Sequence, residues 1–192
     1  MEILKKIRKI GIGVVGLPGS GKSIVSEVAR ELNIPTIVMG DIIRQLCRDR
    51  GLEINSENVG SIMVGIRQEE GMNCVAKRTL PRIAKVKKNI VIIDGLRSFE
   101  EVEFFREHLN KFIIIAIHSS PRTRYGRIRK RNRFDDPQNL KLIQERDLRE
   151  ISVGIAKIIA LTDIMFVNEG KIRPLKQRIS KILQRIQDNR WK

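Results

Sequence analysis

Hydrophobic positions along this chain follow two alternating patterns. Short, nearly continuous apolar runs are separated by longer stretches in which apolar residues recur every three or four positions. The first pattern is typical of strands buried on both faces of a parallel sheet, and the second is typical of helices that cover such a sheet. The runs that predict strands are 10–15, 35–39, 90–94, 112–118 and 164–168.

Start signals and periodicity predict the helices between these runs. Ser56 is expected to cap one helix, and Ser98 with Glu101 three residues later has the pattern of a capping box. The last helix, 172–186, has its apolar residues on one face. The second and third strands are separated by more residues than one crossover needs, so about 41–88 is expected to contain a helical insert. The chain as a whole, 1–192, is expected to form a single α/β domain.

Composition limits the classes of partner. The chain carries 38 Lys and Arg against 22 Asp and Glu, a net charge of +16, which indicates phosphates, nucleic acid or an acidic membrane surface. Nucleic-acid binding usually adds aromatic side chains that stack on bases, and the chain has one Trp and one Tyr. Nucleic acid is therefore the second choice. No stretch is long enough to span a membrane, and Cys47 and Cys74 have no metal-ligand spacing, so we expect a cytoplasmic protein with reduced thiols.

A glycine-rich segment after the first predicted strand has the pattern G-x-x-x-x-G-K-[ST]. It follows an apolar strand and opens a helical stretch, which is the context that a P-loop requires. Its glycines let backbone N–H groups point at phosphate oxygens, and the helix adds its positive end. Lys22 is expected to reach the β- and γ-phosphates and the Ser23 hydroxyl to ligate magnesium, so the cofactors are ATP and Mg²⁺. The predicted nucleotide contacts are Gly16, Leu17, Pro18, Gly19, Ser20, Gly21, Lys22 and Ser23.

A second magnesium ligand is expected at the end of a neighbouring strand. Asp94 ends the predicted strand 90–94 and would hold the ion directly or through water. The alternative is that Asp94 caps the turn before Gly95.

The order of these motifs resembles the nucleoside monophosphate kinase group of P-loop proteins, which includes adenylate kinase and dephospho-CoA kinase. Within that group the chain is most similar to archaeal proteins described as adenylate-kinase-related, of unassigned substrate. The resemblance implies a three-layer fold with a five-stranded parallel sheet in the order 2-3-1-4-5. It also implies that 41–88 covers an acceptor and that about 122–150 forms a short lid.

Two segments resemble acceptor-binding motifs of that group. The segment 39–44 resembles the T-G-D-x-x-R of adenylate kinases, which makes Arg44 a ligand of the acceptor phosphate, and also the D-A-D-x-I of dephospho-CoA kinases, which makes Asp41 a base toward a hydroxyl. Met39 departs from both motifs. The segment 94–97 resembles D-G-[FY]-P-R, which makes Arg97 a second clamp. The alternatives are a helix cap for Asp41 and a solvated helix face for Arg44.

The lid and the adenine side are implied in the same way. Arg127 and Arg131 match the R-I-x-x-R that opens the adenylate kinase lid, and Arg146 matches an arginine on its far side. Together they would stabilise charge on the transferred phosphoryl group. Asn168 and Gly170 match the adenine-side loop of dephospho-CoA kinases. The alternatives are a solvated or RNA-binding basic face for the arginines and an ordinary turn for Asn168 and Gly170.

The predicted function is transfer of the γ-phosphoryl group of Mg-ATP to a small phosphate-bearing acceptor of nucleoside monophosphate or dephospho-CoA type. The alternative is a P-loop ATPase or nucleotide-dependent regulator that binds RNA or a protein through its basic surface. The sequence does not define an oligomeric state. The constellation of Asp41, Arg44 and Arg97 discriminates between the two functions, because a switch protein does not need it.

Overall fold

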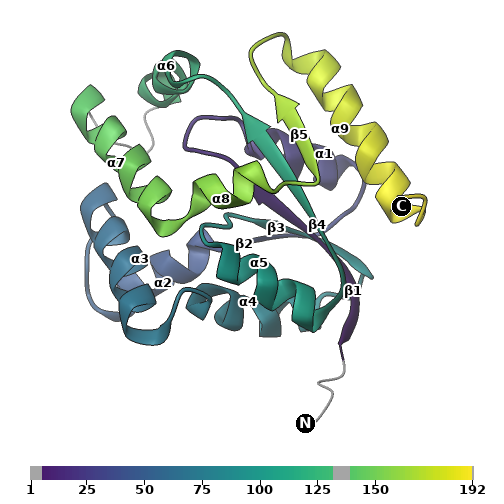
Figure 1. The fold of residues 1–192 in the computed structure, drawn as a ribbon, viewed down its shortest axis with the longest axis horizontal. Coiled ribbons are helices and arrows are strands. Elements are labelled where there is room, and N and C mark those ends of the chain that lie inside the picture. The colour runs from purple at the N-terminus through teal and green to yellow at the C-terminus, as the bar shows by residue number, and fades with distance from the viewer. Residues whose placement is uncertain (1–5, 132–138, 192) are drawn as a thin grey trace.

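The computed structural model describes residues 6–131 and 139–191 as a three-layer α/β fold (Figure 1). Its five-stranded parallel sheet has the order β2-β3-β1-β4-β5, which confirms the predicted fold class and strand order. Two strands, β1 and β4, begin before the predicted positions 10 and 112. The strands are β1 (Ile7–Val15), β2 (Thr36–Val38), β3 (Ile90–Asp94), β4 (Leu109–His118) and β5 (Ile164–Val167).

Helices cover both faces of the sheet (Figure 1). One face is covered by α1 (Ser23–Glu31) and α9 (Ile172–Gln187). The other is covered by α4 (Cys74–Lys85), α5 (Phe99–His108) and α8 (Ile155–Ala160). Three helices form the predicted insert between β2 and β3: α2 (Gly40–Asp49), α3 (Ser56–Glu70) and α4. The predicted lid region contains α6 (Pro121–Arg131) and α7 (Leu140–Val153), and its central part, 132–138, lies outside the described residues. None of the described helices is long and apolar enough to cross a membrane.

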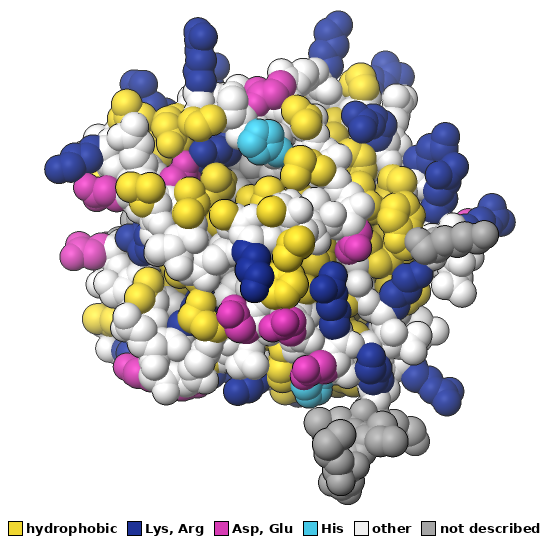
Figure 2. All heavy atoms as spheres, viewed as in Figure 1, with side chains coloured by type: hydrophobic (Ala, Val, Ile, Leu, Met, Phe, Trp, Pro, Cys, Tyr) yellow, Lys and Arg dark blue, Asp and Glu magenta, His cyan; other side chains and the backbone are white. Residues whose placement is uncertain are grey.

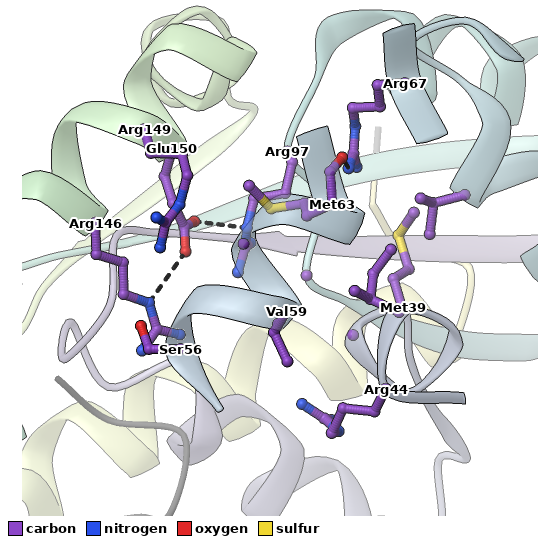
Figure 3. Close-up of a pocket in the computed structure, with 15 residues that line it drawn as sticks. Met39, Arg44, Ser56, Val59, Met63, Arg67, Arg97, Arg146, Arg149 and Glu150 are labelled. Atoms are coloured by element: carbon purple, nitrogen blue, oxygen red, sulfur yellow. Dashed lines mark hydrogen bonds and ion pairs between the residues drawn. The ribbon is translucent and has the colours of Figure 1, made fainter. Parts of the chain in front are cut away.

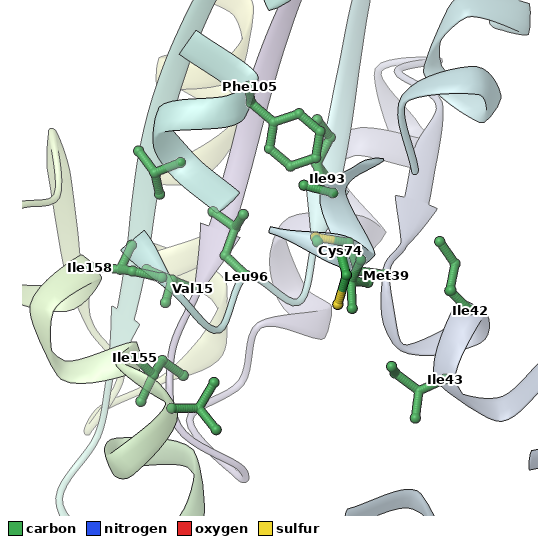
Figure 4. Close-up of a cluster of buried hydrophobic side chains, with 14 of the residues drawn as sticks. Val15, Met39, Ile42, Ile43, Cys74, Ile93, Leu96, Phe105, Ile155 and Ile158 are labelled. Atoms are coloured by element: carbon green, nitrogen blue, oxygen red, sulfur yellow. The ribbon is translucent and has the colours of Figure 1, made fainter. Parts of the chain in front are cut away.

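The continuous apolar runs of the central strands serve two separate cores. In β3, Val91 and Ile93 pack against the layer of α4 and α5, whereas Ile90 and Ile92 pack against the layer of α1 and α9. Successive side chains of a strand point to opposite faces, so a strand covered on both sides has to be apolar at every position. Figure 4 shows part of the first core, where Ile93 lies near Phe105.

The absence of a side chain at Gly13 of β1 lets large side chains of the first core pack against the strand. A Cβ atom on Gly13 would lie 2.5 Å from Leu96 Cδ1 and 2.7 Å from Phe112 Cζ. The ring of Phe112 therefore packs directly on the backbone of the central strand. Leu96, the residue before Arg97, is fully buried at the same point.

Of the two predicted helix caps, the capping box at Ser98 is confirmed and the cap at Ser56 is corrected. The Ser98 hydroxyl accepts from the N–H of Glu101 at 3.3 Å, and the Glu101 carboxylate accepts from the N–H of Ser98 at 3.3 Å, which confirms the capping box. The cap of α3 is Asn55 rather than Ser56. Asn55 precedes the helix with an extended backbone, and its side-chain oxygen accepts from the N–H of Asn58 at 2.9 Å.

A buried ion pair joins the insert to the capping box. Arg67 of α3 donates to Glu101 Oε1 at 2.5 Å, and both side chains are almost fully buried. The other oxygen of Glu101 accepts from the backbone N–H of Arg97 at 2.7 Å. Glu101 therefore fixes the insert and the Arg97 segment relative to each other.

We predict that Glu101→Ala lowers the free energy of unfolding by about 3–5 kcal/mol, because it leaves the charge of Arg67 buried without its partner. Chemical denaturation measures the change. The matched control is Glu100→Ala, an exposed acid in the same first turn, which should cost less than about 1 kcal/mol. Equal losses in the two variants would show that the buried pair contributes nothing specific.

Candidate active site

Three segments that are distant in sequence meet at the carboxyl edge of the sheet. Asp94 at the end of β3 lies opposite Val14 of β1 and opposite Val38 of β2. The N–H of Met39 donates to the carbonyl oxygen of Asp94 at 2.8 Å. Because the carboxyl ends of parallel strands share one edge, the segments 16–23, 39–44 and 94–97 face a common space.

The phosphate loop has the conformation that its glycines permit. Gly19 and Gly21 have φ values of +78° and +100°, which side chains with a Cβ rarely adopt. A Cβ on Gly19 would also lie 2.6 Å from the carbonyl oxygen of Arg124, so α6 packs directly against the loop. Helix α1 begins at Ser23 and points its N-terminus at the space that the loop encloses.

Side chains hold the carbonyl groups of this loop. Arg124 Nη1 donates to the Pro18 carbonyl at 3.1 Å, and Asn168 Nδ2 donates to the Ser20 carbonyl at 2.8 Å. In a planar trans peptide the N–H lies opposite the preceding carbonyl. Fixing these carbonyls on the outer side therefore directs the following N–H groups inward. Lys22 Nζ donates to the carbonyl of Gly16 at 2.7 Å, so the lysine lies across the same loop.

A positively charged cavity surrounds Lys22. Burial, followed by the nearby charge of Arg97, lowers the pKa of Lys22 to about 8, while the carboxylate of Asp94 opposes this shift. Such an environment favours a polyanion, which would offset the mutual repulsion of the cations. The cavity is lined by Pro18, Gly19, Gly21, Lys22 and Ser23 of the loop and by Val38, Gly40, Arg44, Asp94, Gly95, Arg97, Arg131 and Arg146.

The residues present fit a magnesium ion that arrives with a nucleotide. Asp94 Oδ1 is buried and has no hydrogen-bond partner among the described residues, an arrangement that a cation or its water would satisfy. Ser23 lines the same cavity. The described residues contain no group of three or more His, Cys, Asp or Glu placed to hold a metal, so phosphates and water would complete the coordination shell, as magnesium prefers.

A second pocket continues from the phosphate cavity into the insert (Figure 3). The two spaces share Gly40, Arg44, Gly95, Arg97 and Arg146. We call this shared part, which includes three arginines, the mouth of the second pocket. The apolar lining of the second pocket comes from Met39, Ile43, Val59, Met63 and Val75, and its charged lining from Arg44, Arg67, Arg97, Arg146, Arg149 and Glu150.

Glu150 of α7 bridges the two sides of this mouth. Its Oε2 lies 2.6 Å from Arg97 Nε, and its Oε1 lies 3.7 Å from Arg146 Nε; Figure 3 marks both ion pairs. The carboxylate is buried. Arg149, one residue earlier, packs over Gly60 of α3, where a Cβ would lie 2.6 Å from the guanidinium carbon. These contacts bring α7 over the pocket.

A second buried pair anchors α7 to the phosphate loop. Arg124 donates to both carboxylate oxygens of Asp147 at 2.9 and 2.6 Å, and Tyr125 Oη donates to Asp147 at 3.0 Å. Since Arg124 also binds Pro18, the chain of contacts runs from the loop through α6 to α7. Neither acid was predicted from the sequence. Their signal is the spacing of three between Asp147 and Glu150, which places both acids on one face of a helix.

The structure separates the predicted lid arginines. Arg131 and Arg146 line the phosphate cavity. Arg127 is not among the residues that line it, and its role at the transferred phosphoryl group stays a prediction. Its Nη2 donates to the carbonyl of Asn168 at 2.9 Å and its Nη1 to Ser119 Oγ at 3.0 Å, so it supports the loop from outside.

The structure also places the two residues predicted beside adenine, Asn168 and Gly170, and the predicted catalytic base, Asp41. Asn168 is buried and its amide nitrogen is used on the phosphate loop, whereas Gly170 is exposed and lines none of these spaces. Asp41 is exposed in the first turn of α2 and lies outside both cavities. It pairs with Arg44 at 2.5 Å, which departs from its predicted position as a base beside the acceptor.

The parallel sheet, its strand order and the loop before α1 define the class: a P-loop protein with the fold of small-molecule kinases. Residues 15–144 match the family described as AAA domain. The chain is 44% identical to a UPF0200 protein of Hyperthermus butylicus, over 90% of this chain and 92% of the relative, and 43% identical to one of Methanocaldococcus jannaschii, over 93% and 91%. The chain belongs to the UPF0200 family and carries this AAA domain.

Solved structures share the fold at low identity. A shikimate kinase of Bacteroides thetaiotaomicron superposes with a TM-score of 0.59 at 16% identity, covering 91% of this chain and 98% of that one. A gluconokinase of Sinorhizobium meliloti gives 0.55 at 14% identity, covering 96% and 97%. At these identities the similarity establishes the fold alone.

We predict that Lys22→Ala weakens Mg-ATP binding tenfold to a hundredfold, because a charged hydrogen bond contributes about 1.5–3 kcal/mol. Titration calorimetry measures the affinity. Lys181→Ala removes an exposed lysine from α9 and should leave the affinity within experimental error of the unmodified protein. Unchanged binding in the Lys22 variant would place the triphosphate elsewhere.

Proposed function

We propose that the protein transfers the γ-phosphoryl group of Mg-ATP to a small nucleotide-like acceptor, of nucleoside monophosphate or dephospho-CoA type. The observation that carries this proposal is the continuity of the phosphate cavity with the second pocket at Arg44, Arg97 and Arg146. A protein that only hydrolyses ATP needs the first space but not a lined pocket beside it. The junction of the two spaces is where a γ-phosphate and an acceptor would meet.

The residues on the nucleotide side would have three separate roles. The loop amides, the N-terminus of α1 and Lys22 would bind the β- and γ-phosphates. Ser23 and Asp94 would hold magnesium, which when bound neutralises phosphate charge. Arg131 and Arg146 would contact the transferred phosphoryl oxygens, where charge accumulates in the transition state.

The base of the nucleotide would lie beside α1. A hollow next to the loop is lined by Gly21, Ile24, Arg127, Asn168 and Ile172, together with Ser23, Glu27 and Lys176. Asn168 lines this hollow through a side chain already bound to Ser20, so its contribution to adenine binding stays a prediction, as does that of Gly170.

The acceptor side is formed by the insert and by α7. Arg44 and Arg97 would grip the anionic group of the acceptor, and the apolar walls would contact its body. Glu150 ties α7 to Arg97, which keeps the helix over the pocket. A covered pocket would limit hydrolysis, the competing reaction of ATP with water.

The basic surface supports a second candidate function. A net charge of +16 suits a regulator or ATPase that binds RNA or an acidic protein. Figure 2 shows Lys and Arg side chains spread around the viewed face, with acids among them, rather than gathered in one stripe. On this face the spread charge forms no continuous basic stripe, which supports the kinase function over a nucleic-acid surface there. The cytoplasmic location stays a prediction.

We expect RNA and duplex DNA to bind weakly and to dissociate steeply as salt rises, because non-specific contacts to phosphates release counterions. Filter binding between low and near-physiological salt would test this. A sequence-selective complex that survives near-physiological salt would favour the regulator over the kinase.

Arg44→Ala should raise the Michaelis constant of the acceptor tenfold to a hundredfold and leave the affinity for ATP alone nearly unchanged. Arg48→Ala is the matched control, since Arg48 lies one turn further along α2 and lines neither cavity. Arg97 is also the partner of buried Glu150, so Arg97→Lys is preferred there: it keeps the charge and loses the forked geometry.

An acceptor screen with product analysis tests the proposed function itself. Nucleoside monophosphates and dephospho-CoA are incubated with Mg-ATP, and ATP turnover and phosphorylated product are recorded together. If ATP is hydrolysed without any phosphorylated acceptor, and the rate is unchanged in the Arg44 and Arg97 variants, the protein is an ATPase and not a kinase.

A further inference from the structure

A groove lies where β2 and β3 begin, at the opposite end of these strands from the phosphate cavity. Residues of α1, the segment 33–36 and the segment 86–88 line it, and we call it the β2 groove. Its volume is about 720 Å³, within the range of pockets that hold ligands. It shares no lining residue with the phosphate cavity, the second pocket or the hollow beside α1. The β2 groove is therefore a separate feature of the molecule.

A buried lysine holds one wall of the β2 groove in place. Lys9 of β1 is only 8% exposed, and its Nζ donates to the carbonyl oxygens of Val86 and Lys88 at 2.5 and 2.8 Å. A buried ammonium group needs such acceptors, so these bonds fix the backbone of the segment 86–88 against β1. A groove with a fixed wall loses little conformational entropy when a ligand binds.

The β2 groove combines apolar residues with exposed cations. Ile34 and Val86 are among its apolar residues, and its cations are Arg30, Lys87 and Lys88. None of the described residues that line it is acidic. In the described part of the chain, none of the three cations belongs to an ion pair. A ligand that carries both apolar groups and carboxylates would complement this surface.

The outer edge of β2 adjoins the groove. This strand is the first in the sheet order, and β3 is the one described strand beside it. The Pro35 carbonyl accepts from the N–H of Ile92 at 2.8 Å, and the N–H of Met39 donates to the Asp94 carbonyl at 2.8 Å. Backbone groups alternate in direction along a strand, so those of Thr36 and Val38 point away from β3. Thr36 also lines the groove, so an added strand would lie directly beside it.

We propose that the β2 groove binds an extended acidic segment of another protein, which adds to β2 as a further strand. Backbone hydrogen bonds to Thr36 would hold the segment, and its alternate side chains would enter the groove. Its carboxylates would face Arg30, Lys87 and Lys88. This inference does not depend on the reaction at the phosphate cavity.

The other classes of occupant fit the β2 groove less well. A second copy of this chain would bring its own net charge of +16 toward the same cations. A nucleic acid would match the cations, but none of the described residues that line the groove is aromatic, so its bases would have no ring on which to stack.

Selection from a peptide library tests the proposal. Short peptides of random sequence, displayed on phage, are selected on the immobilised full-length chain at near-physiological salt. We expect enrichment of acidic peptides that have apolar residues at alternate positions. If no peptide is enriched, or if the enriched peptides are not acidic, the proposal is wrong. A single-stranded oligonucleotide that displaces the enriched peptide at this salt concentration would also overturn it, in favour of a nucleic-acid site.

A charge reversal locates the binding site of the enriched peptide. Lys87→Glu should weaken binding of the peptide about tenfold, because it replaces an attractive charge with a repulsive one. The matched control is Lys181→Glu, which reverses an exposed cation on α9, outside the β2 groove. Equal losses in the two variants would show non-specific attraction to a basic protein and would overturn the proposal. The affinity for Mg-ATP should be unchanged in both variants, because neither residue lines the phosphate cavity.

N-methylation of the peptide distinguishes an added strand from other binding modes. Each amide of the enriched peptide is methylated in turn, and the affinity is measured by titration calorimetry. In an added strand, alternate N–H groups face β2, so methylation should weaken binding at every second position in the centre of the peptide. Losses without this alternation would show that the peptide does not bind as a strand.

Discussion

The carbonyl groups of the phosphate loop have to be held on the side away from the nucleotide, and much of the site depends on how this is done. None of the described strands pairs with the loop, and side chains distant in sequence supply donors to its carbonyl groups. Arg124 comes from α6 and Asn168 follows β5, and each donates to a loop carbonyl. The inward direction of the amides is thus set before any phosphate arrives, which is the pre-organisation that anion binding requires.

The same donors connect the loop to the covering helices. Arg124 is shared between Pro18 and Asp147, so the position of α7 is linked to the conformation of the loop. Three residues further along α7, Glu150 reaches Arg97 on the acceptor side. Buried charges are costly unless they are paired, and here each pair also fixes a segment that lines one of the two cavities. Removal of either acid would therefore disturb geometry as well as stability.

Kinases of this fold act on chemically unlike acceptors, as the names of the shikimate kinase and gluconokinase neighbours show. The sheet and the phosphate loop supply the common part, the binding of a triphosphate. Under the proposed function, acceptor choice would depend on the insert and on α7, because residues of these elements line the second pocket. In this chain the pocket is lined both by apolar side chains and by arginines.

Sequence alone determined the parts of this protein that depend on local pattern. The apolar runs gave the five strands because a strand covered on both faces must be apolar at every position, and the capping box at Ser98 and the phosphate loop are defined by neighbours in the chain. The resemblance supplied the strand order.

The side-chain partners were decided only by the tertiary structure. Arg127 and Arg131 are one helical turn apart, yet only Arg131 lines the phosphate cavity, while Asp41 turns outward beside Arg44. Asp147 and Glu150 gained their roles from arginines more than twenty residues away, Arg124 and Arg97. Charge can be read from a sequence, but the direction in which a charged side chain points depends on which distant groups the fold brings within hydrogen-bonding reach.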